Sequence, residues 1–121
     1  MPSRSEHIAR AEANEQVVLF LQDAHPDWAL TAMFHAEMNW VDAVLDGLDD
    51  RSIHPRSHAQ RGRYISRSPQ LAAVEQHYAG LRYASVGARY DCDQFEPADV
   101  LHLRSTRYEP VKQACAGILV P

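Results

Sequence analysis

The segment over residues 26–48 constrains the fold more than any other part of the chain. Its apolar residues recur at intervals of three and four, which places their side chains on one face of an α-helix. A second apolar stripe has the same period and consists of Trp28, Ala32, Ala36, Trp40 and Ala43. Two stripes require two covering surfaces, so this helix is predicted to pack against more than one neighbour. The run Asp46-Gly47-Leu48-Asp49-Asp50 is predicted to end it.

The rest of the chain also predicts helices, and no segment shows a convincing strand pattern. A first helix over 5–24 follows the capping box Ser3-Arg-Ser-Glu6 and ends before His25-Pro26. A short helix over 55–61, a long helix over 69–88 and a last helix over 97–119 follow, and Pro110 should kink the last one. These segments predict an all-α fold, a four- to five-helix up-and-down bundle that forms a single domain over 1–121.

Composition narrows the class of protein. Apolar residues make up 45% of the chain and charged residues 23%, the profile of a soluble globular protein. No apolar run reaches the roughly 20 residues that a membrane helix needs, and the polar start of the chain, with Glu6 and Glu12, does not resemble a secretion signal. The two cysteines, Cys92 and Cys115, form no disulfide framework. We therefore expect a reduced, cytoplasmic protein that does not bind membranes.

The arginines are concentrated between residues 51 and 90. Seven arginines and one acid, Glu75, give this segment a formal charge of +6, whereas the remainder is −10 and the whole chain −4. Arginine suits phosphate groups because its guanidinium forms two parallel hydrogen bonds. Two interpretations follow: a phosphate-binding face, or a basic segment that acids of neighbouring helices neutralise within the fold.

Four segments, in this order, resemble the HEPN superfamily of helical bundles. They are Ala9-Arg-Ala-Glu-Ala-Asn14, residues 27–45, His58-Ala-Gln-Arg61 and residues 78–90, and the resemblance covers about residues 5–118. It implies an all-α bundle that is usually a homodimer. It also implies RNA cleavage in many members and a non-catalytic binding role in others. Many bacterial members are encoded beside a nucleotidyltransferase in toxin–antitoxin pairs. We therefore expect an RNA- or nucleotide-related homodimer, with a nucleotidyltransferase or antitoxin protein as a further partner.

Catalytic members of that superfamily carry an arginine, four to six residues and then a histidine. Histidine moves protons near neutral pH, and arginine stabilises the charge of the phosphate. Arg51 and His58 match this spacing, although they follow the second helix whereas the family motif usually lies later, at a helix start. His58 and Arg61 would share one face of a short helix and point toward the same groove as Arg89. The catalytic candidates of a metal-free endoribonuclease are thus His58, Arg51 and Arg61; the alternatives are a solvated basic loop and an Arg61 that pairs with an acid of helix one or two.

Polar residues interrupt the apolar second helix at His35, Asn39 and Asp42. The first two stand where the superfamily usually has Tyr and His. Buried polar groups require partners, so this stripe is either a satisfied network between helices or a cleft in which His35 and Asn39 face Arg82 or Arg89. These four residues are the candidate binding residues. Tryptophans and tyrosines are expected mostly in the core or an interface, not as a surface on which RNA bases stack.

A metal-dependent bundle enzyme is the alternative function. Its ligands would come from His35, Glu37, His54, His58 and His77. The chain contains no Glu-x-x-His pair, so no metal or other cofactor is expected. The two apolar stripes further predict that the second or the last helix lies near the two-fold axis of the homodimer.

Overall fold

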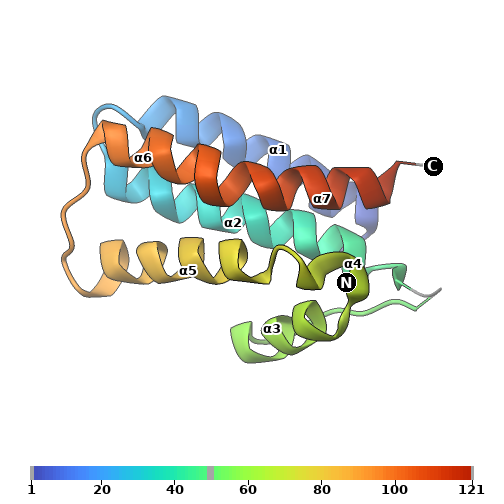
Figure 1. The fold of residues 1–121 in the computed structure, drawn as a ribbon. Coiled ribbons are helices and arrows are strands. Elements are labelled where there is room, and N and C mark those ends of the chain that lie inside the picture. Colours follow the sequence, from blue (N-terminus) through green and yellow to red (C-terminus); the bar gives the residue numbers. More distant parts are fainter. Residues whose placement is uncertain (1, 49–50, 121) are drawn as a thin grey trace.

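A computed structural model describes residues 2–48 and 51–120 and confirms the all-α helical bundle (Figure 1). Its elements are α1 (Arg4–Leu21), α2 (Pro26–Leu45), α3 (His58–Arg67), α4 (Pro69–Ala72), α5 (Glu75–Tyr90), α6 (Pro97–Leu103), the π-helical turn η2 (Arg104–Tyr108) and α7 (Glu109–Leu119). Within the described ranges there is no strand, only an isolated bridge between Asp46 and Ser52.

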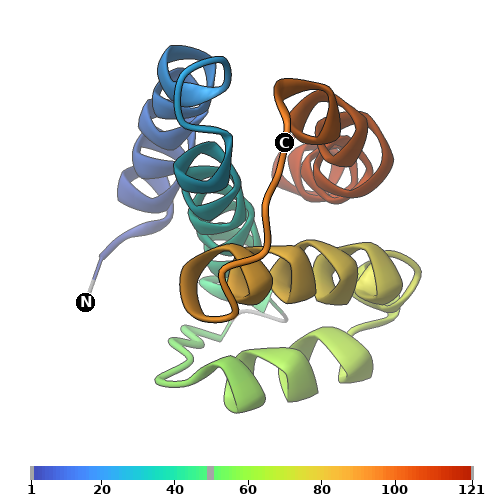
Figure 2. The ribbon, with the colours of Figure 1, turned by 90° about the vertical axis from the view of Figure 1, so that its left-hand side faces the viewer.

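Helix α2 lies at the centre of the molecule. It runs alongside α1 and also packs against α5 and α7, while α3 lies outermost, beyond α5 (Figures 1 and 2). The residues at its contacts are almost all buried, including Leu30, Phe34 and Val41 on one stripe and Ala36 and Ala43 on the other. The prediction of several neighbours is confirmed. Within the chain both stripes are covered except at the exposed Trp28.

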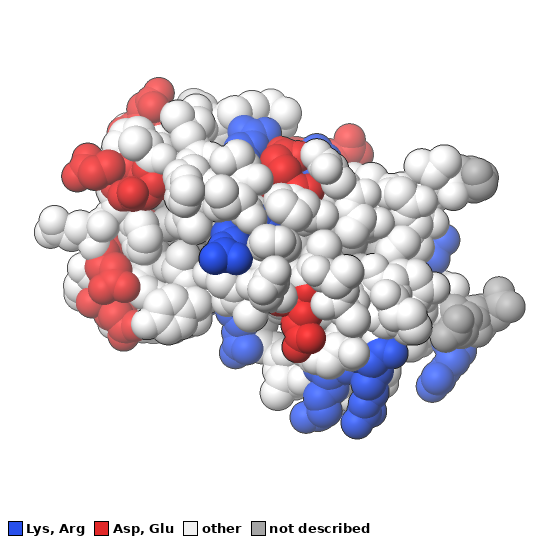
Figure 3. Space-filling model, viewed as in Figure 1, with Lys and Arg blue, Asp and Glu red and all other residues white. Residues whose placement is uncertain are grey.

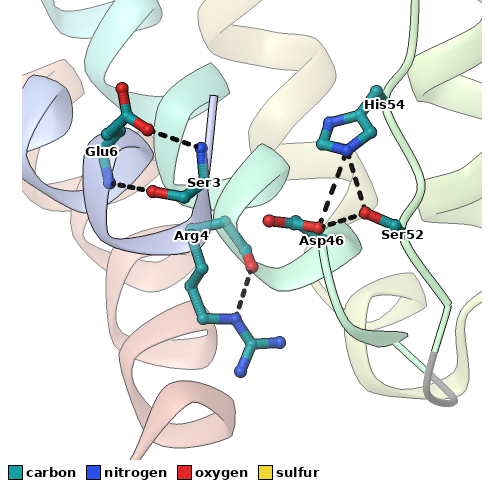
Figure 4. A network of polar contacts seen from close by, with 7 residues as sticks. Ser3, Arg4, Glu6, Asp46, Ser52 and His54 are labelled. Atoms are coloured by element: carbon teal, nitrogen blue, oxygen red, sulfur yellow. Dashed lines mark hydrogen bonds and ion pairs between the residues drawn. The ribbon is translucent and has the colours of Figure 1, made fainter. Parts of the chain in front are cut away.

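The ends of the first two helices follow the predicted signals. The Ser3 hydroxyl accepts a hydrogen bond from the Glu6 amide (3.2 Å), and the Glu6 carboxylate accepts one from the Ser3 amide (3.1 Å), which completes the capping box (Figure 4). Helix α2 ends at Leu45, three residues earlier than predicted, because Gly47 adopts φ +125° and a Cβ there would clash with the guanidinium of Arg4. Asp49 and Asp50 of the predicted stop lie outside the described residues.

Two predicted helices have different boundaries. The short helix begins at His58 because the Ser57 hydroxyl caps it by accepting from the Gln60 amide (3.0 Å). The helix predicted over 69–88 is broken after Ala72, where Val74 leaves helical geometry (φ −111°, ψ 8°). The break allows α4 to contact α7 while α5 lies along α2.

The predicted irregularity in the last helix lies in the turn before Pro110. Proline has no N–H to donate to the preceding turn, and this turn widens into η2. Here the buried Tyr108 hydroxyl accepts a hydrogen bond from the Trp40 indole (3.0 Å) and donates one to Glu15. These bonds join the last helical segment to α1 and α2. No described helix is both long and apolar enough to cross a bilayer.

Candidate nucleic-acid interface

An open groove of about 580 Å³ separates α3 from α5, which lie side by side in both ribbon views (Figures 1 and 2). Apolar atoms of Ile65, Tyr78 and Val86 are part of its lining. The polar and charged residues of the lining are His58, Arg63, Ser66, Arg67, Glu75 and Arg82, together with the exposed Tyr83. The groove thus combines an apolar floor with a predominantly basic rim.

Charge is segregated in space as well as in sequence. On the face drawn in Figure 3, a group of Arg and Lys side chains lies over the α3 side of the molecule, and most of the visible acidic side chains lie at the opposite end, where α2 and α6 begin. A phosphate chain approaching the α3 side therefore encounters a positive surface.

His58 stands in the first turn of α3, at one end of the groove. Its ring packs against Phe34 of α2, with ring centroids 5.7 Å apart and a 37° tilt. Its Nδ1 is buried and has no hydrogen-bond partner among the described residues. Burial and the positive charges of Arg82, Arg61 and Arg89 lower the pKa of His58. The imidazole is therefore neutral at neutral pH and is able to accept a proton.

His35 lies beside this group on α2 and is exposed. Burial of part of its ring, followed by the charges of Arg89 and Arg61, lowers the pKa of His35. The charge of His35 in turn acts on His58. The arginine charges that lower the pKa of one or both histidines thus come from three predicted site residues, Arg61, Arg82 and Arg89. The Asn39 amide nitrogen, by contrast, donates to the His35 carbonyl of its own helix (2.8 Å).

The Arg61 guanidinium forms an ion pair within the fold and is not free to bind a ligand. It is only 6% exposed, and its Nε and Nη2 donate to the two carboxylate oxygens of Asp42 at 2.8 and 3.0 Å. Burial alone would lower the pKa of Arg61, but the hydrogen bonds and charge of Asp42 raise it. This geometry matches the sequence alternative in which Arg61 pairs with an acid of helix two. The pair connects α3 to α2 and so holds His58 in place.

Arg51 stands apart from the cluster. Its side chain is exposed in the turn after α2, where its carbonyl accepts a hydrogen bond from the Gly47 amide (2.6 Å). Arg51 is not among the charges that lower the pKa of His58. Arg51 and His58 have the spacing of the superfamily motif in the sequence, but their side chains are not brought together in the structure.

The residues suggested as metal ligands are dispersed. His54 lies 3.0 Å from the Ser52 hydroxyl and 3.7 Å from Asp46 (Figure 4), and His77 lies 3.2 Å from Arg107. Glu37 is buried in the core. In the parts of the chain that the structure describes, no three His, Cys, Asp or Glu side chains are grouped so that they could hold a metal ion.

Three of the tryptophans and tyrosines lie at the surface of the chain, whereas most of these residues were expected in the core or in an interface. Trp40, Tyr78 and Tyr108 are buried as expected, but Trp28, Tyr83 and Tyr90 are 61%, 82% and 72% exposed. Two of them directly follow site arginines, in Arg82-Tyr83 and Arg89-Tyr90. The repetition of an Arg-Tyr pair seven residues apart, at two turns' spacing on one helix, is the sequence signal that could have revealed them.

We compared the chain with known protein families, curated proteins and solved structures. No family model, no curated protein and no solved structure matches the chain. The functional interpretation accordingly rests on the residues of the α3–α5 groove and the histidines and arginines at its end.

Proposed function

We propose that the protein binds RNA through the α3–α5 groove, with Arg82 and Arg89 as phosphate ligands. The observation that carries the proposal is the basic lining of this groove, to which Arg82, Arg63, Arg67 and His58 contribute, with the charge of Arg89 close enough to lower the pKa of His58. Among the described residues neither Arg82 nor Arg89 forms an ion pair, whereas Arg61 does. Their guanidinium groups are thus available to a ligand phosphate.

Fluorescence anisotropy with a labelled single-stranded RNA tests the proposal. The double variant Arg82→Ala/Arg89→Ala should bind about tenfold more weakly or worse, because each charged hydrogen bond contributes about 1.5–3 kcal/mol. It should also reduce the slope of log K against log salt by about 1.4, since each single-strand phosphate contact contributes about 0.7.

The matched control is Arg10→Ala/Arg104→Ala, which removes the same charge from α1 and η2. Arg10 is exposed, and Arg104 makes only a long pair with Glu109 (3.6 Å). The proposal fails if the wild type does not bind RNA, or if both double variants weaken binding equally.

The two histidines of this region, His35 and His58, suggest a second candidate function, metal-free RNA cleavage. One histidine would take the proton of a ribose 2′-hydroxyl, and the other would protonate the leaving 5′-oxygen, which yields a 2′,3′-cyclic phosphate and a 5′-hydroxyl. The lowered pKa of His58 suits the role of base. His58→Ala should abolish cleavage measured in the presence of a chelator, whereas the exposed His102→Ala should not. Cleavage that persists in His58→Ala, or that stops with the chelator, rejects this mechanism.

The resemblance to the HEPN superfamily supports a further proposal, that the protein works as half of a two-gene module. Its partner would be a nucleotidyltransferase or an antitoxin protein. Co-expression with the product of a neighbouring gene, followed by size-exclusion chromatography, tests for a stable complex. Separate elution of the two proteins would leave RNA binding as the function of the isolated chain.

A further inference from the structure

A second concave site lies between the start of α2 and the end of α5. It has a volume of about 310 Å³ and is lined by Asp27, Trp28, Thr31, Ala88, Arg89 and Tyr90. None of these residues lines the α3–α5 groove. Arg89 nevertheless connects the two regions, because it lines this pocket and its charge also lowers the pKa of His35 and His58.

Two large aromatic side chains of this pocket are exposed. Trp28 is 61% and Tyr90 72% exposed, whereas most of the neighbouring residues of α2 are buried. Exposed aromatic rings beside an arginine are the elements with which proteins bind unpaired nucleobases, by stacking on the ring and holding the adjoining phosphate. The guanidinium carbon of Arg89 already lies 5.1 Å from the Tyr90 ring centroid, so a cationic ligand would be repelled there.

We propose that this pocket binds a guanine base, stacked on Trp28 and Tyr90, while the phosphate attached to that nucleotide lies on Arg89. The proposal rests on the RNA-binding function proposed above and names the base that this surface selects. Arg89 contributes an Nε that is buried without a hydrogen-bond partner in the described part of the chain. The phosphate would contact the rest of the Arg89 guanidinium, which forms no ion pair among the described residues.

The choice of guanine follows from Asp27. A carboxylate at the pocket wall accepts hydrogen bonds and repels other acceptors. Guanine is the RNA base whose Watson–Crick edge presents two adjacent donors, N1–H and the N2 amino group, and these match the two carboxylate oxygens. Adenine and cytosine place a ring acceptor beside their amino group, and uracil offers one N–H between two carbonyls. Asp27 is exposed and forms no ion pair among the described residues, so it is available for this contact.

Tryptophan fluorescence measures base binding directly. The chain has two tryptophans, of which Trp40 is buried and hydrogen-bonded to Tyr108, so quenching by an added nucleotide reports on Trp28. Titration with GMP should quench the emission at concentrations at which AMP, CMP and UMP do not. Asp27→Asn should remove this preference, and Tyr90→Ala should weaken GMP binding about tenfold or more. Phe20→Ala, which removes an exposed ring of α1 outside both this pocket and the α3–α5 groove, should leave GMP binding unchanged.

RNA binding separates the two proposals. For a guanine-containing oligonucleotide, Trp28→Ala should cost about tenfold or more, and for the same oligonucleotide without guanine it should cost little. Equal affinity of wild type and Trp28→Ala for both RNAs, with Arg82→Ala/Arg89→Ala still defective, overturns the guanine pocket and leaves RNA binding intact. GMP quenching without any RNA binding overturns the proposed function and supports a pocket for free guanine nucleotides. Quenching by all four nucleotides alike refutes the assignment to guanine.

Discussion

Replacing Glu37 by glutamine should stabilise the protein, and the gain should grow with pH. Glu37 stands in the middle of α2, is 0% exposed, and neither of its carboxyl oxygens has a hydrogen-bond partner among the described residues. Burial raises the pKa of Glu37 well above its ordinary value of 4.5. The folded protein therefore keeps this carboxyl protonated at a pH at which the unfolded chain has already released the proton.

The sign and size of the effect follow from proton linkage. Below pH 4.5 both states bind the proton, and the residue adds no pH dependence. Above that pH the unfolded state gains by ionising, so the free energy of unfolding falls by about 1.4 kcal/mol per pH unit until the raised pKa of the folded state is reached. Glutamine does not ionise and lacks this slope. The difference in stability between Glu37→Gln and wild type should thus grow by about 1.4 kcal/mol per pH unit.

Urea unfolding between pH 5 and pH 8 measures this difference. Cys115 and Tyr78 face the same part of the core, where an ionised Glu37 would raise the pKa of both groups further. Burial raises the pKa of each to about 12, so neither ionises in the folded state over this range. By thermal unfolding the expected gain is about 5 °C per pH unit for a chain of this size.

Glu12→Gln provides the control, because Glu12 is an exposed glutamate on α1. Its stability difference from wild type should show no comparable slope. A flat difference curve for Glu37→Gln would refute the reasoning, since it would mean that Glu37 ionises as readily in the folded protein as in the unfolded chain. A variant that is less stable at every pH, again with no slope, would show that the carboxylate has a charged or hydrogen-bonded partner.

Two further predictions concern stability and assembly. Arg61→Ala should lower the free energy of unfolding by about 3–5 kcal/mol in urea, because it leaves unpaired an Asp42 carboxylate whose side chain is only 13% exposed. The apolar double variant Arg61→Met/Asp42→Leu should recover most of that loss, and a double variant as unstable as Arg61→Ala would contradict this account. We also predict a homodimer that uses the exposed apolar side chains of α1, among them Leu19 and Phe20. Light scattering at micromolar concentration should show a dimer that Phe20→Glu converts to a monomer, and a monomeric wild type would reject the prediction.

The helices were predictable from the sequence wherever a local signal sets them. The Ser3 capping box and Pro26 act within one turn of the chain, and each has the predicted effect. At Pro110, where a kink was predicted, the structure has the wider π-helical turn η2 directly before α7. Ser57 is also a local signal, but Pro55 is an equally good start for a helix in the sequence. The predicted helix therefore begins at residue 55, three residues before the observed start of α3 at His58. The break after Ala72 has no such signal. The apolar period continues through it, and the packing of α4 on α7 decides the geometry.

Part of the candidate site was also predictable. Spacing alone suggested that His58 and Arg61 would point toward the same groove as Arg89, and in the structure the charges of Arg61 and Arg89 lower the pKa of His58 and His35. Spacing could not decide whether Arg61 would face a ligand or an acid, because Asp42 lies nineteen residues away in sequence and meets Arg61 only after α3 folds back on α2. The exposure of Trp28 could not be predicted from the sequence either, because Trp28 belongs to an apolar stripe whose other members are buried.

The pairing of Arg61 divides the arginines of the basic segment into two kinds. Asp42 compensates the charge of Arg61 at hydrogen-bond distance, so this pair contributes little net field outside the fold. The field at the groove then comes from Arg63, Arg67, Arg82 and Arg89, for which no ion pair is present among the described residues. Any effect of an Arg61 variant on RNA affinity should consequently follow the displacement of α3 and His58, and it should disappear in a variant whose apolar pair restores the fold. The two interpretations of the basic segment, internal neutralisation and phosphate binding, are thus compatible because they apply to different arginines.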